Sequence, residues 1–467
     1  RSRLSMQNLD GSDYAMRNKT YEALDLSNNI SSVGITRYYV RTVKGKNGDE
    51  KFALTLNSSR INEFESDLTI RDVCGWVKSK IDEIGQLGVM PDTLLTAFAK
   101  PENYSAIYKQ LVPSSLLVFY GLIDSIRDEQ HVEFYHINGN GVKRKIDDPI
   151  IEKYISHISR AFTTVQTEVK DDGNHYYVGE NNAIEIKLTK TGIRLINKTW
   201  KSICIEGSED GEYDGDLQSV INHNHQFNVY FTDKELVYGN KTLFRDGRLL
   251  TSIPQFLKVF KVIPGLGGTQ YEKFSVASPA GMGGWGPDGI FQLVENTFMG
   301  NYKFFICDDC EDEWADHIGI TDDKVSFFVS KHKISKDSAS DFQDVVGQAL
   351  KDLGNLSPTK GQLDAKAAEW SGLYLTSAML RLRKATGTVQ DAVDLWRNNV
   401  MSPNFEREMC LVVDFLSYGT FSNQLTDMAN NVPVVHEASL YQRLWILSSF
   451  VNGCLEVGVK PIIYCKS

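Results

Sequence analysis

The hydrophobic pattern of the C-terminal part constrains the fold of this chain more than any other feature. Apolar residues at helical spacing predict helices over 288–298 and 340–353, and Asp288 is a suitable N-cap for the first. Between these helices, short apolar runs predict two paired strands, 314–320 and 324–330. A helix, paired strands, a second helix and further strands form the order of an α/β sandwich.

The remaining elements are predicted from the same two signals, which are helical spacing of apolar residues and short apolar runs. In the C-terminal part, we expect helices at 363–383, 389–398 and 440–451 and buried strands at 409–415 and 461–464. In the N-terminal part, we expect strands at 36–43, 51–56, 131–137, 142–146, 183–188, 192–196 and 227–231, and helices at 72–87 and 253–262. The chain therefore divides into a polar N-terminal arm (1–34), a mixed α/β recognition or assembly domain (35–270) and a C-terminal domain (271–467).

Composition excludes several protein classes. Hydrophobic residues make up 42% and charged residues 24%, which is typical of a globular protein and excludes a disordered chain or a coiled-coil rod. No run of about 18 apolar residues occurs, so no membrane-spanning helix is predicted. The net charge of −10 means that contact with nucleic acid requires a local basic surface. The sparse, odd set of 7 cysteines favours a reducing compartment, and we expect a cytoplasmic protein.

Three motifs have a structural interpretation that is simpler than a functional one. Cys307 and Cys310 form a C-x-x-C pair, but no second pair completes a zinc site, which favours two ordinary thiols. His223 and His225 have no third ligand nearby in the sequence, which favours a surface role. The glycine-rich stretch 281–289 lacks a Gly-Lys-Ser/Thr motif, and we interpret it as a flap beside a site.

Acidic residues gather around the first predicted strand of the C-terminal part. They are Asp309, Glu313 and Asp316 on the approach to that strand and Glu295 on the preceding helix, and Lys331 ends the next strand. In a short hairpin, the centre of one strand lies beside the end of its partner, so Asp316 and Lys331 are expected to meet. Carboxylates bind Mg²⁺ through oxygen, and a lysine can neutralise charge on a phosphate or orient water. The pattern indicates a magnesium-dependent phosphodiesterase; the alternative is an acidic loop beside a structural hairpin.

The phrase Glu313-Trp-Ala-Asp316 and its hydrophobic continuation resemble the PD-(D/E)XK, or restriction-endonuclease-like, nuclease superfamily, most of all its branch in bacterial anti-phage defence systems. The likeness covers about residues 285–467. It implies an α/β (α+β) fold with an αβββαβ core and added helices. It also implies a DNA substrate, Mg²⁺ or Mn²⁺ as the cofactor, and a partner such as an NTPase, a helicase or another defence subunit.

The resemblance also implies roles for individual residues. Asp316 and Glu295 would be metal ligands and catalytic residues, with Asp309 and Glu313 as further candidate ligands, and Lys331 would be the catalytic lysine. One residue departs from the superfamily pattern, because Val329 stands where the acid of the (D/E)-x-K tripeptide is expected. Either Glu295 or Glu313 replaces that acid, or the domain is a catalytically degenerate subunit that binds DNA or docks a partner.

Contacts with nucleic acid are expected from polar and basic residues around this core. The candidates are Lys333, Gln343, Gln348, Arg381, Arg383 and Lys384, of which the two arginines and Lys384 are expected on one helix. The basic run Lys143-Arg144-Lys145 is a further candidate or a solvated basic surface. Residues 1–270 show no catalytic signature, and we expect them to bind a partner protein or a second copy of this chain; the alternative is a domain that binds DNA ends or substrate.

Overall fold

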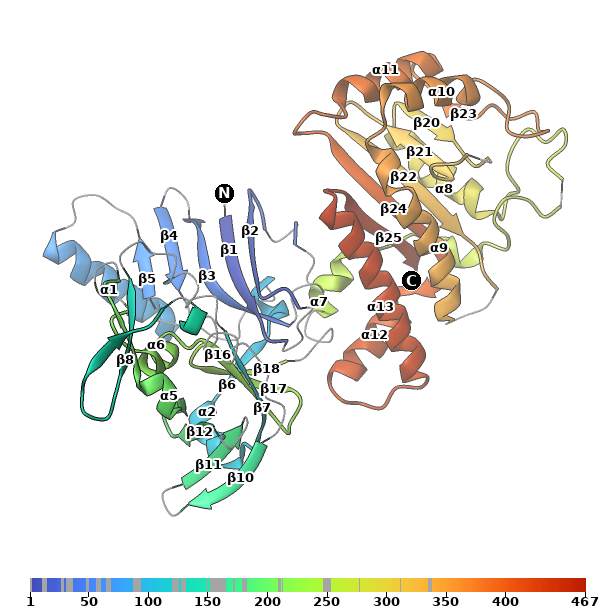
Figure 1. Cartoon of the computed structure of the whole chain (residues 1–467). Helices are drawn as coiled ribbons and strands as arrows, with labels where there is room; N and C mark the ends of the chain where they lie inside the picture. Colours follow the sequence, from blue (N-terminus) through green and yellow to red (C-terminus); the bar gives the residue numbers. More distant parts are fainter. Residues whose placement is uncertain are drawn as a thin grey trace. The chain divides into compact units, whose positions relative to one another are not determined.

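The structure is a computed structural model that describes residues 2–10, 15–26, 29–30, 37–47, 50–55, 60–63, 69–86, 94–119, 126, 132–147, 149–151, 165–170, 173–178, 183–208, 211, 213–246, 253–276, 278–310, 312–334 and 338–467. The chain divides into two compact units (Figure 1). The first comprises Arg1–Leu26, Ile35–Pro91 and Phe98–Arg248, and the second comprises Ser27–Gly34, Asp92–Ala97 and Leu249–Ser467. Both units contain helices and sheets, which confirms the predicted mixed α/β class.

The described part of the first unit contains four sheets. One has the order β2-β1-β3-β4-β5, with β1 (Ser2–Asn8), β2 (Asn18–Ala23), β3 (Tyr38–Asn47), β4 (Glu50–Thr55) and β5 (Arg60–Glu63). Another has the order β6-β18-β17-β16-β7, with β6 (Lys100–Glu102), β18 (Thr242–Arg245), β17 (Leu236–Gly239), β16 (Phe227–Phe231) and β7 (Pro113–Val118). The third is β10 (Val165–Lys170), β11 (Gly173–Val178), β12 (Ile184–Thr189) and β13 (Gly192–Ile196) in that order. The fourth is β15 (Gly215–Asp216), β14 (Ile203–Glu206), β8 (Glu133–Ile137) and β9 (Lys143–Lys145) in that order.

The expectation that residues 1–34 form a separate polar arm is wrong for strand β1. Strand β1 pairs with β2 on one side and with β3 on the other, so it is an interior strand of its sheet. Its side chains alternate between polar and apolar, and Leu4 and Met6 are buried. Two buried apolar side chains among polar neighbours are a weak sequence signal for a strand. The pairing of β1 with strands on both sides stabilises it, and local periodicity does not show this pairing.

Among the described residues of the first unit, one helix is long and the others are short. They are α1 (Ile70–Gly85), α2 (Tyr104–Ile107), α5 (Lys198–Lys201) and α6 (Leu217–His223), with a 3-10 turn at η4 (Tyr108–Gln110). The Thr69 side chain and the Asp72 side chain form a capping box at the start of α1, which confirms the helix predicted over 72–87. None of the α1 residues is buried.

One mixed sheet of seven strands organises the second unit. The strands, in spatial order, are β19 (Phe260–Val262), β25 (Lys460–Lys466), β24 (Glu406–Ser417), β22 (Lys324–Lys331), β21 (His317–Ile320), β20 (Phe304–Cys307) and β23 (Leu382–Lys384). Strands β20, β21 and β22 form an antiparallel meander, whereas β22, β24 and β25 are parallel. Strands β22 and β24 are almost completely buried, as expected for parallel strands with helices on both faces.

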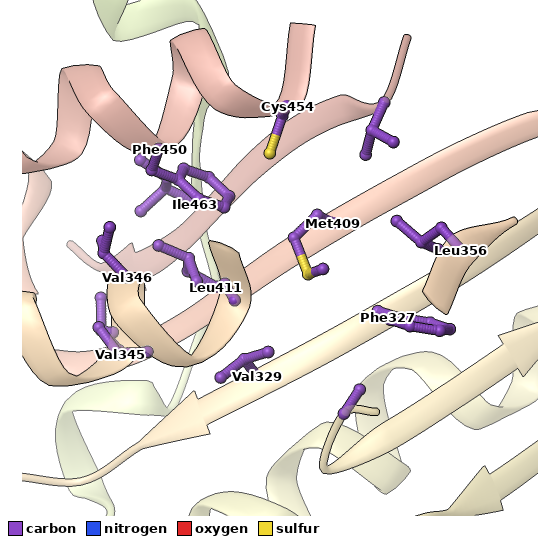
Figure 2. Packing of buried hydrophobic residues seen from close by; sticks show 14 of the residues in the cluster. Phe327, Val329, Val345, Val346, Leu356, Met409, Leu411, Phe450, Cys454 and Ile463 are labelled. Carbon is purple, nitrogen blue, oxygen red and sulfur yellow. The ribbon is translucent and has the colours of Figure 1, made fainter. Parts of the chain in front are cut away.

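Helices cover both faces of this sheet. They are α7 (Ile253–Phe256), α8 (Ile290–Phe298), α9 (Ala339–Lys351), α10 (Lys360–Trp370), α11 (Val389–Asn399), α12 (Tyr418–Ala429) and α13 (Glu437–Glu456), with 3-10 turns η3 (Leu94–Ala97), η8 (Leu257–Val259), η9 (Leu266–Gly268), η10 (Met299–Asn301) and η11 (Leu353–Leu356). On one face, Phe327 and Val329 of β22 belong to a core with Val345 of α9 and Phe450 of α13 (Figure 2). On the other face, Phe328 packs in a core with residues of α8. Among the described helices, none combines the length and apolar character that a membrane crossing requires.

Several predicted elements within the second unit are wrong. The segment 253–262 contains only the single helical turn α7, a 3-10 turn and then strand β19, instead of one helix. The helix predicted over 363–383 ends at Trp370, and Arg383 and Lys384 lie in β23. Gly289, and not Asp288, is the N-cap of α8. In the first two cases the local hydrophobic spacing suits a helix, but pairing in the large sheet decides the conformation of β19 and β23.

Candidate metal centre

The loop between β20 and β21 carries the predicted acidic residues, and Asp308 holds this loop in place. The buried Asp308 carboxylate accepts hydrogen bonds from the Trp314 backbone amide (2.8 Å), Trp370 Nε1 (2.7 Å) and Lys366 Nζ (3.0 Å). The Asp308 amide donates to the Asp316 carbonyl oxygen (3.1 Å), which closes the base of the loop. Asp308 is therefore a structural residue that positions its neighbours.

The same loop brings together Asp309, Glu313 and Asp316, which we call the acidic triad. One carboxylate oxygen from each residue lies within 4.8 Å of the other two. Asp309 and Asp316 are buried, and Glu313 is partly buried. Within the described residues, this is the one group of three or more His, Cys, Asp or Glu side chains with potential ligand atoms so close together.

Burial and mutual repulsion make the ionised triad costly. Burial, followed by the charge of Asp309, raises the pKa of Asp316 well above its ordinary value, although the Ser330 amide donates a hydrogen bond to its carboxylate (2.5 Å). Burial and the charge of Asp309 also raise the pKa of Glu313. Three converging carboxylates in a buried position fit a hard divalent cation, because the cation replaces lost hydration and removes the repulsion.

Two lysines belong to the surroundings of the triad. Lys273 Nζ donates to Asp309 Oδ1 at 2.8 Å and lies 2.6 Å from Asp309 Oδ2. Lys331, the predicted catalytic lysine, has its Nζ 3.1 Å from Glu272 Oε2. Glu272 Oε1 in turn lies 4.0 Å from Lys273 Nζ. Lys331 is thus linked to the triad through Glu272 and Lys273, two residues that the sequence analysis missed.

Two further side chains orient the triad. Gln348 of α9 donates from Nε2 to Glu313 Oε1 (2.6 Å), so one of the two candidate glutamines of this helix reaches the site. The Tyr374 hydroxyl donates to Asp309 Oδ2 (2.6 Å) from the loop that follows α10. Burial and the neighbouring charge of Asp309 raise the pKa of Tyr374, so the hydroxyl remains a donor at neutral pH. The sequence analysis missed Tyr374 because it assigned this position to a long helix.

Glu295 is not part of the acidic triad. Its carboxylate accepts from Trp285 Nε1 (2.6 Å) and from Arg383 Nε (2.6 Å) and Nη2 (3.1 Å), and it lies 3.5 Å from His317 Nε2. Burial alone raises the pKa of Glu295, but the hydrogen bonds and charges of His317, Arg383 and Trp285 outweigh burial and lower the pKa to about 2. The predicted ligand Glu295 and the predicted DNA contact Arg383 therefore form an ion pair with each other and balance each other's charge.

The other candidate DNA contacts lie in different surroundings. Arg381 donates to Cys310 Sγ and lies 3.7 Å from Glu369. Lys384 donates to two backbone carbonyls at the end of α8 (3.1 and 2.9 Å). Lys333 Nζ donates to Asp344 (3.2 Å), and Gln343 is exposed on α9. Within the described residues, Arg381, Arg383 and Lys384 do not share a helix, because they follow the turn after α10 and lie in or beside β23.

The position expected for the missing acid belongs to the hydrophobic core. Val329 is fully buried among residues of α9, β24 and β25, including Val345 and Leu411 (Figure 2). An ionised carboxylate at this position would face aliphatic side chains, at a cost of several kcal/mol by transfer estimates. The acids available to a metal therefore come from the β20–β21 loop and not from β22.

A hydrogen-bond network holds the backbone that follows Lys331. Asp414 of β24 accepts from the Thr269 hydroxyl (2.6 Å), from the Lys333 amide (3.2 Å) and from His332 Nδ1. Strands β22 and β24 are parallel, so their carboxyl ends lie side by side and bring His332 to Asp414. This network orients the end of β22, from which Lys331 projects.

Comparison with known proteins adds no assignment: no family model, no curated protein and no solved structure matches this chain.

Proposed function

We propose that the second unit is a metal-dependent nuclease that hydrolyses phosphodiester bonds in DNA. The observation that carries this proposal is the acidic triad, in which Asp309, Glu313 and Asp316 place carboxylate oxygens within 4.8 Å of one another in a largely buried position. Among the described residues, Lys273 is the one cation in contact with these three acids, so it balances only part of their negative charge. A divalent cation completes the charge balance.

The surrounding residues have separate roles in this proposal. Asp309, Glu313 and Asp316 hold Mg²⁺ or Mn²⁺, which supplies Lewis acidity toward the phosphate and an activated water when bound. The Lys331 ammonium group contacts the scissile phosphate in this proposal. The phosphate then competes with Glu272 for the ion pair with Lys331. Gln348 and Tyr374 keep the Glu313 and Asp309 carboxylates in place through hydrogen bonds.

The order of elements supports the proposed superfamily. Helix α8, strands β20, β21 and β22, helix α9 and strand β24 follow one another as an αβββαβ core would, with α10, β23 and α11 inserted before β24. In this arrangement Asp316 precedes the second strand and Lys331 ends the third. A loop carboxylate, Glu313 or Asp309, replaces the acid that Val329 cannot supply.

Plasmid cleavage tests the proposal. The full chain is incubated with supercoiled plasmid and either Mg²⁺, Mn²⁺ or EDTA, beside the variants Asp316→Asn and Lys331→Ala. We expect metal-dependent nicking by the wild type and a loss of about 100-fold or more in each variant, as for removal of a metal ligand or of a group that stabilises developing charge. Equal nicking by all three proteins would contradict the catalytic assignment.

A catalytically degenerate subunit is the second candidate function, and the burial of Val329 in the core favours it. In this version the fold binds DNA or docks an NTPase or helicase partner without cleaving. A titration with Mn²⁺ in the presence of DNA separates the two candidates. A protein that neither binds Mn²⁺ nor cleaves the DNA supports the degenerate subunit.

The biological setting is part of the proposal. A nuclease free in a cell threatens the host's own DNA, so we assign it to the cytoplasm of a bacterium as the effector of an anti-phage defence system, under the control of a partner. All seven cysteines are free thiols, which suits a reducing compartment. Binding of residues 1–270 to a partner protein or to a second copy stays a prediction.

A further inference from the structure

A pocket in the first unit is lined by cationic and hydroxyl-bearing side chains. It has a volume of about 810 Å³, within the range of small-molecule sites. Its walls are strands β12 and β13, helices α5 and α6, and the two-residue turn between β17 and β18. The charged and imidazole side chains in its lining are Lys187, Arg194, Lys201, His223, His225 and Lys241. Among the described residues that line the pocket, none is acidic.

Two of these cations stand directly opposite each other. Lys187 of β12 and Arg194 of β13 are register partners in the antiparallel pair. Like charges at such positions destabilise a sheet, because their side chains project side by side from the same face. Among the described residues, Arg194, Lys201 and Lys241 form no ion pair. The protein as a whole has a net charge of −10, so this concentration of uncompensated positive charge runs against the overall composition.

Other basic residues of the same unit have acidic partners. Lys143 pairs with Glu206, and Lys145 pairs with Glu133. Arg245 pairs with Glu102 (2.7 Å) and with Glu235 (2.9 Å). Arg194, Lys201 and Lys241 have no such partner among the described residues, although they line one pocket together. This gathering of unpaired cations points to an anion supplied from outside the chain.

Lys241 occupies a backbone position that suits glycine. Gly239 and Thr242 pair across the hairpin, so Asn240 and Lys241 form its two-residue loop. Their φ angles are 49° and 66°, the left-handed pair that favours Asn followed by Gly. A lysine at the second position is strained, and such strain is found where a side chain has a function.

Hydrogen bonds connect two walls of the pocket. The Asn222 side chain accepts from the Leu195 amide and donates to the Leu195 carbonyl oxygen (2.8 Å each), which fixes α6 against β13. His225 Nδ1 is buried without a hydrogen-bond partner among the described residues. Burial, and then the charges of Lys241 and His223, lower the pKa of His225 to about 4, so this imidazole is neutral at physiological pH.

We infer that this pocket binds phosphate groups, with Arg194, Lys201 and Lys241 as the charged contacts and the Thr191 hydroxyl as a further polar contact. Phosphate is the anion that several dispersed cations and hydroxyl donors recognise best, because its oxygens accept from many directions. The phosphates come from a nucleic-acid strand or from a free nucleotide. This inference goes beyond the proposed nuclease function and does not depend on the acidic triad.

Fluorescence anisotropy of the full chain tests the inference, with EDTA present so that the metal centre plays no part. The probes are a labelled single-stranded oligonucleotide of about 20 nucleotides and a labelled nucleoside triphosphate. The pocket variants are Lys241→Gly and Arg194→Ala. The matched control is Lys80→Ala, which removes a lysine of α1 that is paired with Glu83 (3.1 Å) and does not line the pocket.

We expect at least one probe to bind and each pocket variant to weaken it about tenfold, with a salt dependence reduced by about one charge, while the control changes affinity less than about twofold. Lys241→Gly also relieves the left-handed strain, so its Tm should rise by about 2–4 °C as binding weakens, which separates lost contact from lost folding. Binding of the oligonucleotide identifies a nucleic-acid strand, and binding of the triphosphate alone identifies a nucleotide. No binding of either probe, or an equal loss in the control, would overturn the inference.

Discussion

Glu295 and Asp316 are both buried carboxylates of the second unit, but their surroundings are opposite. Glu295 accepts two hydrogen bonds from Arg383 and one from Trp285, and its pKa is lowered to about 2. Asp316 lies with Asp309 and Glu313, and burial together with the charge of Asp309 raises its pKa well above the ordinary value. A buried acid whose charge is already balanced is part of the structure, whereas buried acids that repel one another either take up protons or gain charge balance from a bound cation.

The largest expected effect comes from removing one charge of the triad. Asp316→Asn should lower metal-dependent cleavage by about 100-fold or more, because a ligand is lost. Without metal, the same variant should be as stable as the wild type or more stable, because burial of a repelled charge is removed. Initial nicking rates and thermal unfolding in EDTA measure the two effects. Asp312→Asn, an exposed position of the same loop, is the matched control and should leave both unchanged.

Glu295→Gln should have the reverse signature. It leaves the partly buried Arg383 without its anionic partner, so the free energy of unfolding should fall by about 3 kcal/mol. Urea unfolding of the wild type and the variant gives this value. Cleavage by the folded variant should persist, because Glu295 does not touch the triad. A variant of normal stability that no longer binds Mn²⁺ would instead make Glu295 a ligand.

The difference in unfolding free energy between the wild type and Glu295→Gln should depend on pH. A carboxylate whose pKa is lowered on folding, here from 4.5 to about 2, stabilises the folded state above the higher value and loses this contribution as the pH falls toward the lower one. The gap in unfolding free energy between the wild type and Glu295→Gln should therefore shrink from about 3 kcal/mol near pH 6 to less than half of that near pH 3. A gap that does not change with pH would contradict the balanced-charge account of Glu295.

A smaller effect is expected from the hydrogen bond that orients Glu313. Gln348→Ala should weaken Mn²⁺ binding about tenfold, as is usual for a residue that positions a ligand without touching the metal. Gln343→Ala on the same helix is the control, since Gln343 is exposed. Equal Mn²⁺ affinity of the two variants would remove Gln348 from the site.

Local patterns predicted much of the fold. Strands β13 and β16 begin and end at the expected residues, and the hairpin of β8 and β9 forms around its Asn-Gly turn. The acidic triad was also within reach, because its members are separated by only a few residues in one loop before a strand. In contrast, β1 and β23 depend on pairing with distant strands, which local periodicity does not show.

Charge pairs between residues far apart in the sequence could not be predicted, either around Glu295 or in the first unit. Glu295 and Arg383 are far apart in the sequence, so nothing local indicates that they neutralise each other. The basic run Lys143-Arg144-Lys145 gives a second example, because both of its lysines have acidic partners that lie elsewhere in the sequence. The cations of the pocket are dispersed over four elements, and only the fold brings them together.

Calorimetric titration of Mn²⁺ into the full chain tests the central claim most directly. The claim predicts saturable binding by the wild type and by Glu295→Gln, and loss of that binding in Asp316→Asn, because only the second substitution alters the acidic triad. Unchanged Mn²⁺ binding by Asp316→Asn, or no binding by the wild type even with DNA present, would contradict the claim.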